Sequence, residues 1–396
     1  MPIPRLRRYE GPALLSYGFR PFFLGGAIFA AIAVLLWLPL RGGDIALATA
    51  FVPRDWHVHE MLYGYLPAAV TGFLLTAIPN WTGRLPIQGT PLLTLVLVWI
   101  AGRIAVALSA EIGWLAAALI DVSFLFLVAA ATAREIAAGR NWRNLKVVAM
   151  VSVLLIGNVA FHLEAHFTGV ADISIRVGIA GIVLLIAVIG GRIIPSFTRN
   201  WLARQKPGRL PSPFGRFDVA VIAASAMALA LWVWRPEGPI SGATLAVAGL
   251  LHLARLARWA GERTLRERLL LVLHVGYAFV PFGFLLCAAA AFDWISASAG
   301  IHAWTVGAAG IMTLAVMSRA TLGHTNNALT ATLATQAIYA AVIVAALSRV
   351  CAALEPARSE PLLALAALTW SLAFFGFAAA YGPALARPIR VPQPAG

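Results

Sequence analysis

The sequence predicts an all-α polytopic membrane protein with about twelve transmembrane helices. Of its 396 residues, 61% are hydrophobic and only 12% are charged, a composition that excludes an ordinary soluble enzyme. Apolar runs of about twenty residues, the length that crosses a bilayer as a helix, recur along the whole chain. Basic residues gather in the short loops between alternate runs, as they do in the cytoplasmic loops of membrane proteins.

The first predicted helix follows a basic opening. The segment MPIPRLRR leads through SYGFRPFF into an apolar run that extends to Leu40. This run is too long for the core of a signal peptide and lacks a small-residue cleavage site. We therefore expect no cleavable signal, and the run should stay in the protein as its first helix.

The remaining runs are separated by segments too short to form a soluble domain, so we expect a single transmembrane domain over residues 1–396. Hydropathy places the twelve helices, in chain order, near residues 17–40, 56–79, 91–109, 112–133, 145–166, 174–195, 217–234, 240–259, 268–291, 299–320, 328–349 and 361–385.

The loops also predict an orientation and a repeat. Most of the 30 Lys and Arg residues fall on one side of the membrane if the amino terminus is cytoplasmic, which predicts that both termini are cytoplasmic. The second, sixth and tenth helices close with TAIPNWTGRLP, RIIPSFTRNWL and AVMSRATLGHT. This spacing suggests a three-fold repeat of four-helix units, although the ordinary tendency of proline to end helices explains part of the likeness.

Charge and cysteine content exclude several classes. The net charge of +14 is explained by the basic loops, so we expect contact with membrane lipid and no nucleic-acid partner. The only cysteines, Cys287 and Cys351, lie within predicted helices. A disulfide framework, a zinc ribbon and covalent CxxCH haem attachment are therefore excluded, and any haem must be held non-covalently.

Histidines are the main candidates for chemistry, because a polar group in hydrocarbon costs several kcal/mol unless it is paired or functional. The predicted topology puts five at an outer level and three at an inner level, which indicates two sites, or one site and additional structural residues. The outer five are His57, His59, His162, His166 and His302, and the inner three are His252, His274 and His324.

The spacing of the outer histidines limits how they can bind a metal. His57 and His59 lie about 200° apart around an ideal helix, so they share one ion only if that turn is unwound; otherwise they face different partners. His162 and His166 share a helix face, a spacing that suits metal binding. An imidazole-rich, thiolate-poor set suits copper, haem iron or zinc. The alternative for each histidine is a helix cap or an interfacial side chain, which fits His166 and His324 best.

Four other side chains extend these candidate sites. Glu60 could orient an imidazole, accept a proton or pair with Arg103, which is embedded in the third helix. Tyr63 follows His59 by four residues and could reach the same site. Arg192, near the inner face, either extends toward the lipid headgroups or binds haem propionates or an anionic substrate.

Several longer motifs resemble one known family. They are GFRPFFLGG, WHVHEMLYGY, TAIPNWTGRLP, GGRIIPSFTRNW, LHLARLARW, LHVGYAFVPFGF and HAWTVGAAGIMTLAVMSRATLGHT. Together, from about Gly18 to His324, they resemble the NnrS family of bacterial inner-membrane proteins. The resemblance implies non-covalent haem b, copper, and a role in denitrification and in protection against nitric oxide and nitrosative stress.

By motif, the resemblance carries over six histidines: His57, His59, His252, His274, His302 and His324. His162 and His166 fall outside the strongest motifs, which lowers our expectation that they are ligands. One departure is local, since Asn326 and Asn327 follow GHT where the family usually continues with Gly-Arg.

These observations predict a haem-copper metalloprotein that acts on nitric oxide or a related small molecule, with an unidentified electron donor. In this layout His57, His59 and His302 surround an outer metal, with Glu60 and Tyr63 supplying hydrogen bonds or protons. In the same layout, the haem is bound by the inner histidines His252, His274 and His324. The arginines expected to contact the cofactor are Arg192 and Arg103.

Whether such a protein turns over as an oxidoreductase stays open. One alternative is a transporter or exporter, which the few acidic residues within helices (Glu60, Asp121 and Glu164) disfavour. The other is a non-catalytic nitric-oxide or redox sensor.

Overall fold

Twelve helices of the computed structural model, which describes residues 9–388, are long and apolar enough to cross a membrane. The structure is 81% helical, and the described part of the chain contains no strand. The predicted fold class is therefore confirmed. The basic opening MPIPRLRR, which contributed to the predicted cytoplasmic amino terminus, lies outside the described residues.

Ten spans are continuous α-helices or nearly so, and two are divided by π-helical segments. In chain order the elements are α1 (Phe19–Gly42), α2 (Pro53–His59), η2 (Glu60–Tyr65), α3 (Leu66–Thr82), α4 (Thr90–Ala107), the short α5 (Ser109–Ile112), α6 (Trp114–Ala138), α7 (Leu145–Thr168), α8 (Ile173–Leu202), α9 (Arg216–Trp234), α10 (Pro239–Ala257), η4 (Gly261–Thr264), α11 (Arg268–Ala291), α12 (Ala297–His302), η5 (Ala303–Gly310), α13 (Ile311–His324), α14 (Leu333–Leu354) and α15 (Ser359–Ala386).

Most helix ends lie within a few residues of the predicted ones, and two differ for identifiable reasons. The sixth span was expected to end at about residue 195, but α8 continues past Pro195 to Leu202, since a membrane helix tolerates proline where neighbouring groups satisfy the backbone. The eleventh span begins at Leu333 rather than near residue 328. The Thr332 hydroxyl accepts the Thr335 amide at 3.2 Å and caps the helix there.

Four spans form the centre of the bundle. In the second, sixth, ninth and tenth spans, 61–78% of the most apolar window is buried within the protein, against 39–44% in the other eight. The outer spans therefore leave one face for lipid. Three of the central spans are those that the predicted four-helix repeat relates, although the repeat itself stays a prediction.

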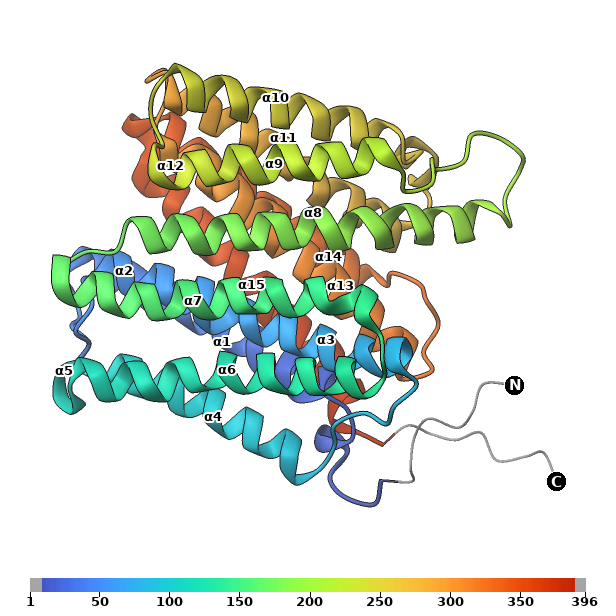
Figure 1. Cartoon of the computed structure of the whole chain (residues 1–396), viewed down its shortest axis with the longest axis horizontal. Coiled ribbons are helices and arrows are strands. Elements are labelled where there is room, and N and C mark those ends of the chain that lie inside the picture. The colour runs from blue at the N-terminus through green and yellow to red at the C-terminus, as the bar shows by residue number, and fades with distance from the viewer. Residues whose placement is uncertain (1–8, 389–396) are drawn as a thin grey trace.

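The helices run roughly parallel to the long axis of the molecule (Figure 1). In that view α9 and α10 lie at the top, α8 and α7 follow, and α6 and α4 lie at the bottom. The first and last helices are neighbours, because α1 packs against α15.

Hydrogen bonds from Arg20 stabilise this contact between the first and last helices. Its buried guanidinium donates to the carbonyls of Ala384, Leu385 and Arg387 at 3.4, 2.7 and 2.8 Å, groups that the end of α15 leaves without helical partners.

The π-helical segments occur in the two most buried spans, and each directly follows a predicted metal ligand. Segment η2 begins one residue after His59, and η5 begins one residue after His302. A π-helical turn holds an extra residue and is frequently found at functional sites. The central part of the fold thus carries both the histidines and the irregular backbone.

Candidate metal centre and adjoining cavity

The rings of His57 and His59 point to two different places. Val52 is extended and Pro53 is the first helical residue, so α2 is a regular α-helix through His59. The two side chains therefore diverge as the helical period requires. His59 enters a polar cluster between α6 and α7, whereas His57 lines a cavity beside α1 and α15. The structure does not bring them together around one ion.

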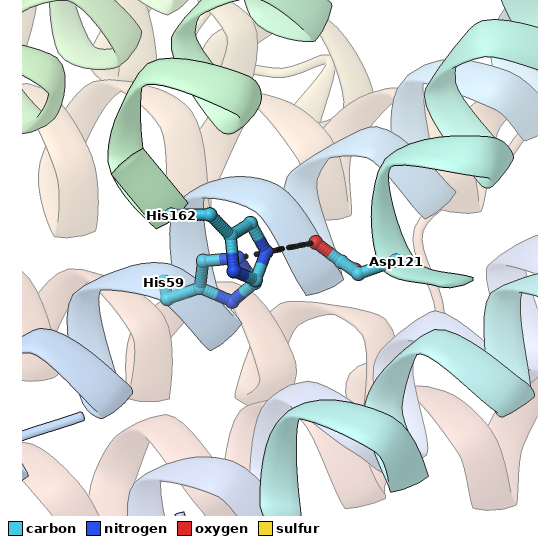
Figure 2. A group of neighbouring side chains, drawn as sticks. All are labelled: His59, Asp121 and His162. Carbon is cyan, nitrogen blue, oxygen red and sulfur yellow. Dashed lines mark hydrogen bonds and ion pairs between the residues drawn. The ribbon is translucent and has the colours of Figure 1, made fainter. Parts of the chain in front are cut away.

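The polar cluster is built on three helices by His59 of α2, Asp121 of α6 and His162 of α7. Figure 2 shows both imidazoles directed at the Asp121 carboxylate. The Nε2 atoms of His59 and His162 lie 3.2 and 3.1 Å from Asp121 Oδ2. One ligand atom from each residue falls within 4.8 Å of the others, and all three residues are buried. We call these three residues the His-Asp-His cluster.

Glu60, Arg103 and Asn158 surround the cluster with further polar contacts. Glu60 Oε1 accepts hydrogen bonds from His59 Nδ1 at 3.1 Å and from Arg103 Nη1 at 2.8 Å. Arg103 Nη2 also donates to Asp121 Oδ1. Asn158 donates through Nδ2 to Asp121 Oδ2 at 2.8 Å, and its Oδ1 lies 3.0 Å from His59 Nε2. His59 and Asp121 are thus held in orientation by further polar residues, as is usual around metal sites.

Two glycines make room for Arg103 and Asp121 in this arrangement. A Cβ added at Gly64, inside η2, would lie 2.4 Å from Arg103 Nη1, and one at Gly102 would lie 3.0 Å from Asp121 Oδ1. The Gly64 carbonyl accepts the Trp99 indole N–H at 2.9 Å. The irregular turn therefore admits the guanidinium and keeps its own backbone hydrogen-bonded.

The charges of this site do not cancel. Glu60 and Asp121 supply two negative charges and Arg103 supplies one positive charge, so with neutral imidazoles the site carries a net charge of −1. A net charge in a buried site is costly. A metal cation, or a proton bound by an imidazole or a carboxylate, would compensate it.

The donor chemistry of the His-Asp-His cluster fits a copper ion. Two imidazole nitrogens and a carboxylate oxygen are ligands that copper, zinc and non-haem iron accept, whereas calcium and magnesium prefer oxygen alone. The neighbouring Glu60 carboxylate contacts the other nitrogen of His59, Nδ1, so Nε2 is the nitrogen of His59 that would bind an ion.

A separate cavity of about 130 Å³ lies beside the cluster. Its walls come from α1, both π-helical segments, α8, α14 and α15, and they are apolar except for His57, His302, Thr305 and Arg349 and the edges of Trp37, Tyr65 and Trp370. Its volume is below the range of about 300–1,000 Å³ usual for cofactor and drug-sized ligand sites, so only a small group fits there without movement of the side chains.

The polar groups of this cavity are only partly satisfied. His302 Nδ1 donates to the Ser298 carbonyl at 2.7 Å. His57 stacks on Trp37 with ring centroids 4.5 Å apart. His57 Nδ1 and Trp37 Nε1 are both buried and have no hydrogen-bond partner among the described residues. Arg349 donates to the Ser298 hydroxyl at 3.2 Å and forms no ion pair with any described carboxylate.

The three inner histidines occupy different surroundings. His252 is fully buried and uses both nitrogens, with the Ser225 hydroxyl at 2.8 Å and the Tyr277 hydroxyl at 3.0 Å. His274 Nε2 lies 3.0 Å from the Thr198 hydroxyl, and its Nδ1 is buried without a partner among the described residues.

His324, in contrast, packs on two aromatic residues, one that precedes α1 and one that begins it. Its ring centroid lies 5.7 Å from that of Tyr17 and 5.5 Å from that of Phe19. His252 and His274 flank Tyr277 and Trp259, so the structure does not gather the three predicted haem ligands around one centre.

The remaining predicted site residues are placed as follows. Tyr63 donates its hydroxyl to the Ser174 carbonyl at 3.0 Å, away from the His-Asp-His cluster, although its ring packs on His59. The Arg192 guanidinium lies over the Phe214 ring at 5.7 Å. Arg103 pairs with Glu60, one of the alternatives considered from the sequence, and takes no part in the inner level.

Sequence reasoning did not place Asp121 and His162 in a cluster with His59. Asp121 is an acidic residue within a span. Because burying a charged side chain in a membrane is costly, such a residue is as strong a functional candidate as the histidines. His162 was paired with His166 by spacing, but His166 is exposed and stacks on Trp114 at 4.0 Å. Asp121 and His162 lie on different helices, so their contact results from the packing of those helices and no local sequence pattern indicates it.

Comparison with known proteins supports the resemblance drawn from the motifs. The family model for the NnrS protein matches residues 13–388. No curated protein matches the chain.

Proposed function

The chain belongs to the NnrS family, and from this premise we propose that it is a haem- and copper-containing membrane protein that acts on nitric oxide or a derived reactive nitrogen species. The observation that carries the proposal is the His-Asp-His cluster, a buried set of metal-ligand side chains inside a multi-pass membrane protein. We place the protein in the bacterial inner membrane with both termini cytoplasmic, as its loop charges predict.

In this proposal His59, Asp121 and His162 hold the copper ion. When bound, copper would supply one-electron chemistry and an open coordination position for a small ligand. Glu60 keeps His59 in the tautomer that presents Nε2, and Arg103 offsets the negative charge of Glu60 and Asp121. The two carboxylates and the guanidinium thus fix both the geometry and the charge of the site.

The surroundings favour an uncharged diatomic substrate. The aromatic rings of Phe51 and Phe161 pack on His59 at 5.2 and 5.0 Å and exclude bulk water from the cluster. Nitric oxide is small and weakly polar, so it partitions into the bilayer and can reach a site between helices without a hydrated channel. An external donor would have to supply electrons for any reduction.

Metal analysis of the purified, detergent-solubilised protein tests this function. We expect copper and haem in fixed ratio to protein, and consumption of nitric oxide by the reduced protein that falls in His162→Ala and Asp121→Asn. Protein without copper and without a Soret band would refute the metalloprotein function. Metal-loaded protein that binds nitric oxide without consuming it would instead indicate a sensor.

A further inference from the structure

The cavity beside the His-Asp-His cluster combines apolar walls with a positive charge that no side chain neutralises. His57, His302 and Arg349 line it, and none of the described residues in its walls is acidic. We propose that this cavity binds a small monovalent oxyanion, with the Arg349 guanidinium as its anchor and the His57 imidazole as a second hydrogen-bond donor. The inference goes beyond the haem and copper function proposed above and does not depend on it.

Arg349 brings the positive charge into the cavity from α14. Its guanidinium donates to the neutral Ser298 hydroxyl at 3.2 Å and forms no ion pair with any described carboxylate. A second arginine, Arg41 of α1, lies over the Trp37 ring at 6.0 Å, but it is already paired with Glu360 at 2.9 Å. Because an unpaired cation within a membrane span is costly, Arg349 favours an anionic partner.

The imidazole of His57 is free to bind the same ligand. Its Nδ1 is buried without a partner among the described residues, and its ring stacks on Trp37 with centroids 4.5 Å apart. The stacking fixes the plane of the ring, so Nε2 is the nitrogen left to donate to a ligand in the cavity.

His302 has a different part in the site. Its Nδ1 donates to the Ser298 carbonyl at 2.7 Å, so the Nε2 of the neutral ring accepts a hydrogen bond and does not donate one. A water molecule can bridge this nitrogen to the anion by donating to each. Because Ser298 contacts both His302 and Arg349, the start of α12 holds both side chains in place.

The size and charge of the cavity select the ligand. Its volume is about 130 Å³, and a water molecule needs about 10–15 Å³ of such volume, so a small anion and a few waters fit. One negative charge neutralises Arg349, whereas a divalent anion would leave an uncompensated charge among apolar walls. The planar guanidinium matches two oxygens of one ligand, which favours an oxyanion over a halide.

Thermal unfolding of the purified full-length protein in detergent tests the proposal, with sodium nitrate as the probe and sodium gluconate at equal ionic strength as the reference. Nitrate should raise the unfolding temperature of the wild type saturably, and sodium sulfate should not. Arg349→Gln should weaken nitrate binding by at least about tenfold, because a charged donor is lost, and His57→Ala by about two- to tenfold. Arg41→Gln is the matched control and should bind nitrate as the wild type does, since that exposed arginine already has a carboxylate partner.

Stability without the anion separates a binding role of Arg349 from a structural one. In gluconate, Arg349→Gln removes an uncompensated charge, so the variant should unfold at a temperature no lower than the wild type does. A variant that unfolds at a lower temperature in both salts, with the full increment from nitrate retained, would assign Arg349 a structural role and overturn the proposal.

The inference and the proposed function fail separately. An unfolding temperature that is equal in nitrate and gluconate, or a nitrate affinity unchanged in Arg349→Gln, overturns the anion site and leaves the proposed function standing. A metal that is lost in both His57→Ala and His302→Ala, from protein that does not respond to nitrate, would assign the cavity to a metal ion and likewise overturn the anion site. Protein without copper and haem that still responds to nitrate overturns the function alone.

Discussion

Replacement of Asp121 by Asn discriminates a metal centre from a purely structural ion-pair network. The substitution keeps the shape of the side chain but removes the carboxylate that accepts from Arg103, Asn158 and His162. The chain offers a matched control in Asp218→Asn. Asp218 forms the other buried aspartate–arginine pair, with Arg255 at 2.8 Å.

The two substitutions should cost comparable stability. Removing one partner of a buried ion pair destabilises a protein by about 3–5 kcal/mol, because the other charge is left uncompensated. In Asp121→Asn, Arg103 keeps Glu60 at 2.8 Å, so we expect a loss near the lower value. In Asp218→Asn, Arg255 keeps only neutral acceptors, the Tyr277 hydroxyl and the Ala187 carbonyl, so we expect a loss near the upper value.

The response to metal should differ. A ligand present at 100 times its Kd stabilises the folded state by about 2.7 kcal/mol. Wild type and Asp218→Asn should both gain this increment when copper is added to metal-depleted protein, whereas Asp121→Asn should gain almost none. Thermal unfolding in detergent, with and without copper, and copper content per chain measure the effect. Equal copper content and equal stabilisation in Asp121→Asn would refute the assignment of Asp121 as a ligand.

Three further substitutions test other parts of the structure. Gly178→Ala should lower the free energy of unfolding by about 1–3 kcal/mol through overpacking, because the added Cβ would lie 2.4 Å from Tyr63 Oη. Gly323→Ala is the control, since the nearest atom to its Cβ is 3.9 Å away. It should leave the free energy of unfolding unchanged in the same assay. Arg20→Met should cost about 3 kcal/mol, since three carbonyls at the end of α15 lose a charged donor; the exposed Arg41→Met should change unfolding far less. The hydrogen bond from Arg209 lowers the pKa of Glu262 in the folded protein. The stabilisation that this bond gives is therefore present at pH values above the unfolded pKa of about 4.3. It is lost as the pH falls through the lower pKa of the folded state. Hydrogen exchange in the loop between α8 and α9 should therefore distinguish Glu262→Gln from wild type at about pH 7, and the difference should shrink as the pH falls below about 4.3. A difference that does not shrink in acid would contradict this explanation.

The sequence was sufficient to predict the spans because bilayer thickness and hydrocarbon solvation act on each helix separately. A run such as 268–291 must be helical and apolar whatever its neighbours are, and α11 has those bounds. The position of Pro195 was less informative, since whether a proline ends a membrane helix depends on the helices packed around it.

The candidate site was predictable in part. The two-residue spacing of His57 and His59 correctly indicated that a regular helix would send them to different partners. Which partners these are depends on the packing of α6 and α7 against α2, and no local pattern records that packing. His302 and Arg349 likewise meet at one cavity from helices far apart along the chain, so only the tertiary structure places an anion-binding side chain beside that imidazole.

The π-helical segments η2 and η5 also make the central spans sensitive to length. Each holds one residue more than a regular turn. A deletion within Glu60–Tyr65 would shorten the wide turn to an α-helical one and leave the flanking helices in register, whereas a deletion at the start of α3 would rotate the rest of that helix by about 100° relative to His57 and His59. Gly72 and the other small residues that α3 packs against α1 would then face the wrong neighbours. In these two spans a one-residue deletion outside the π-helical turns is therefore a larger change than most substitutions.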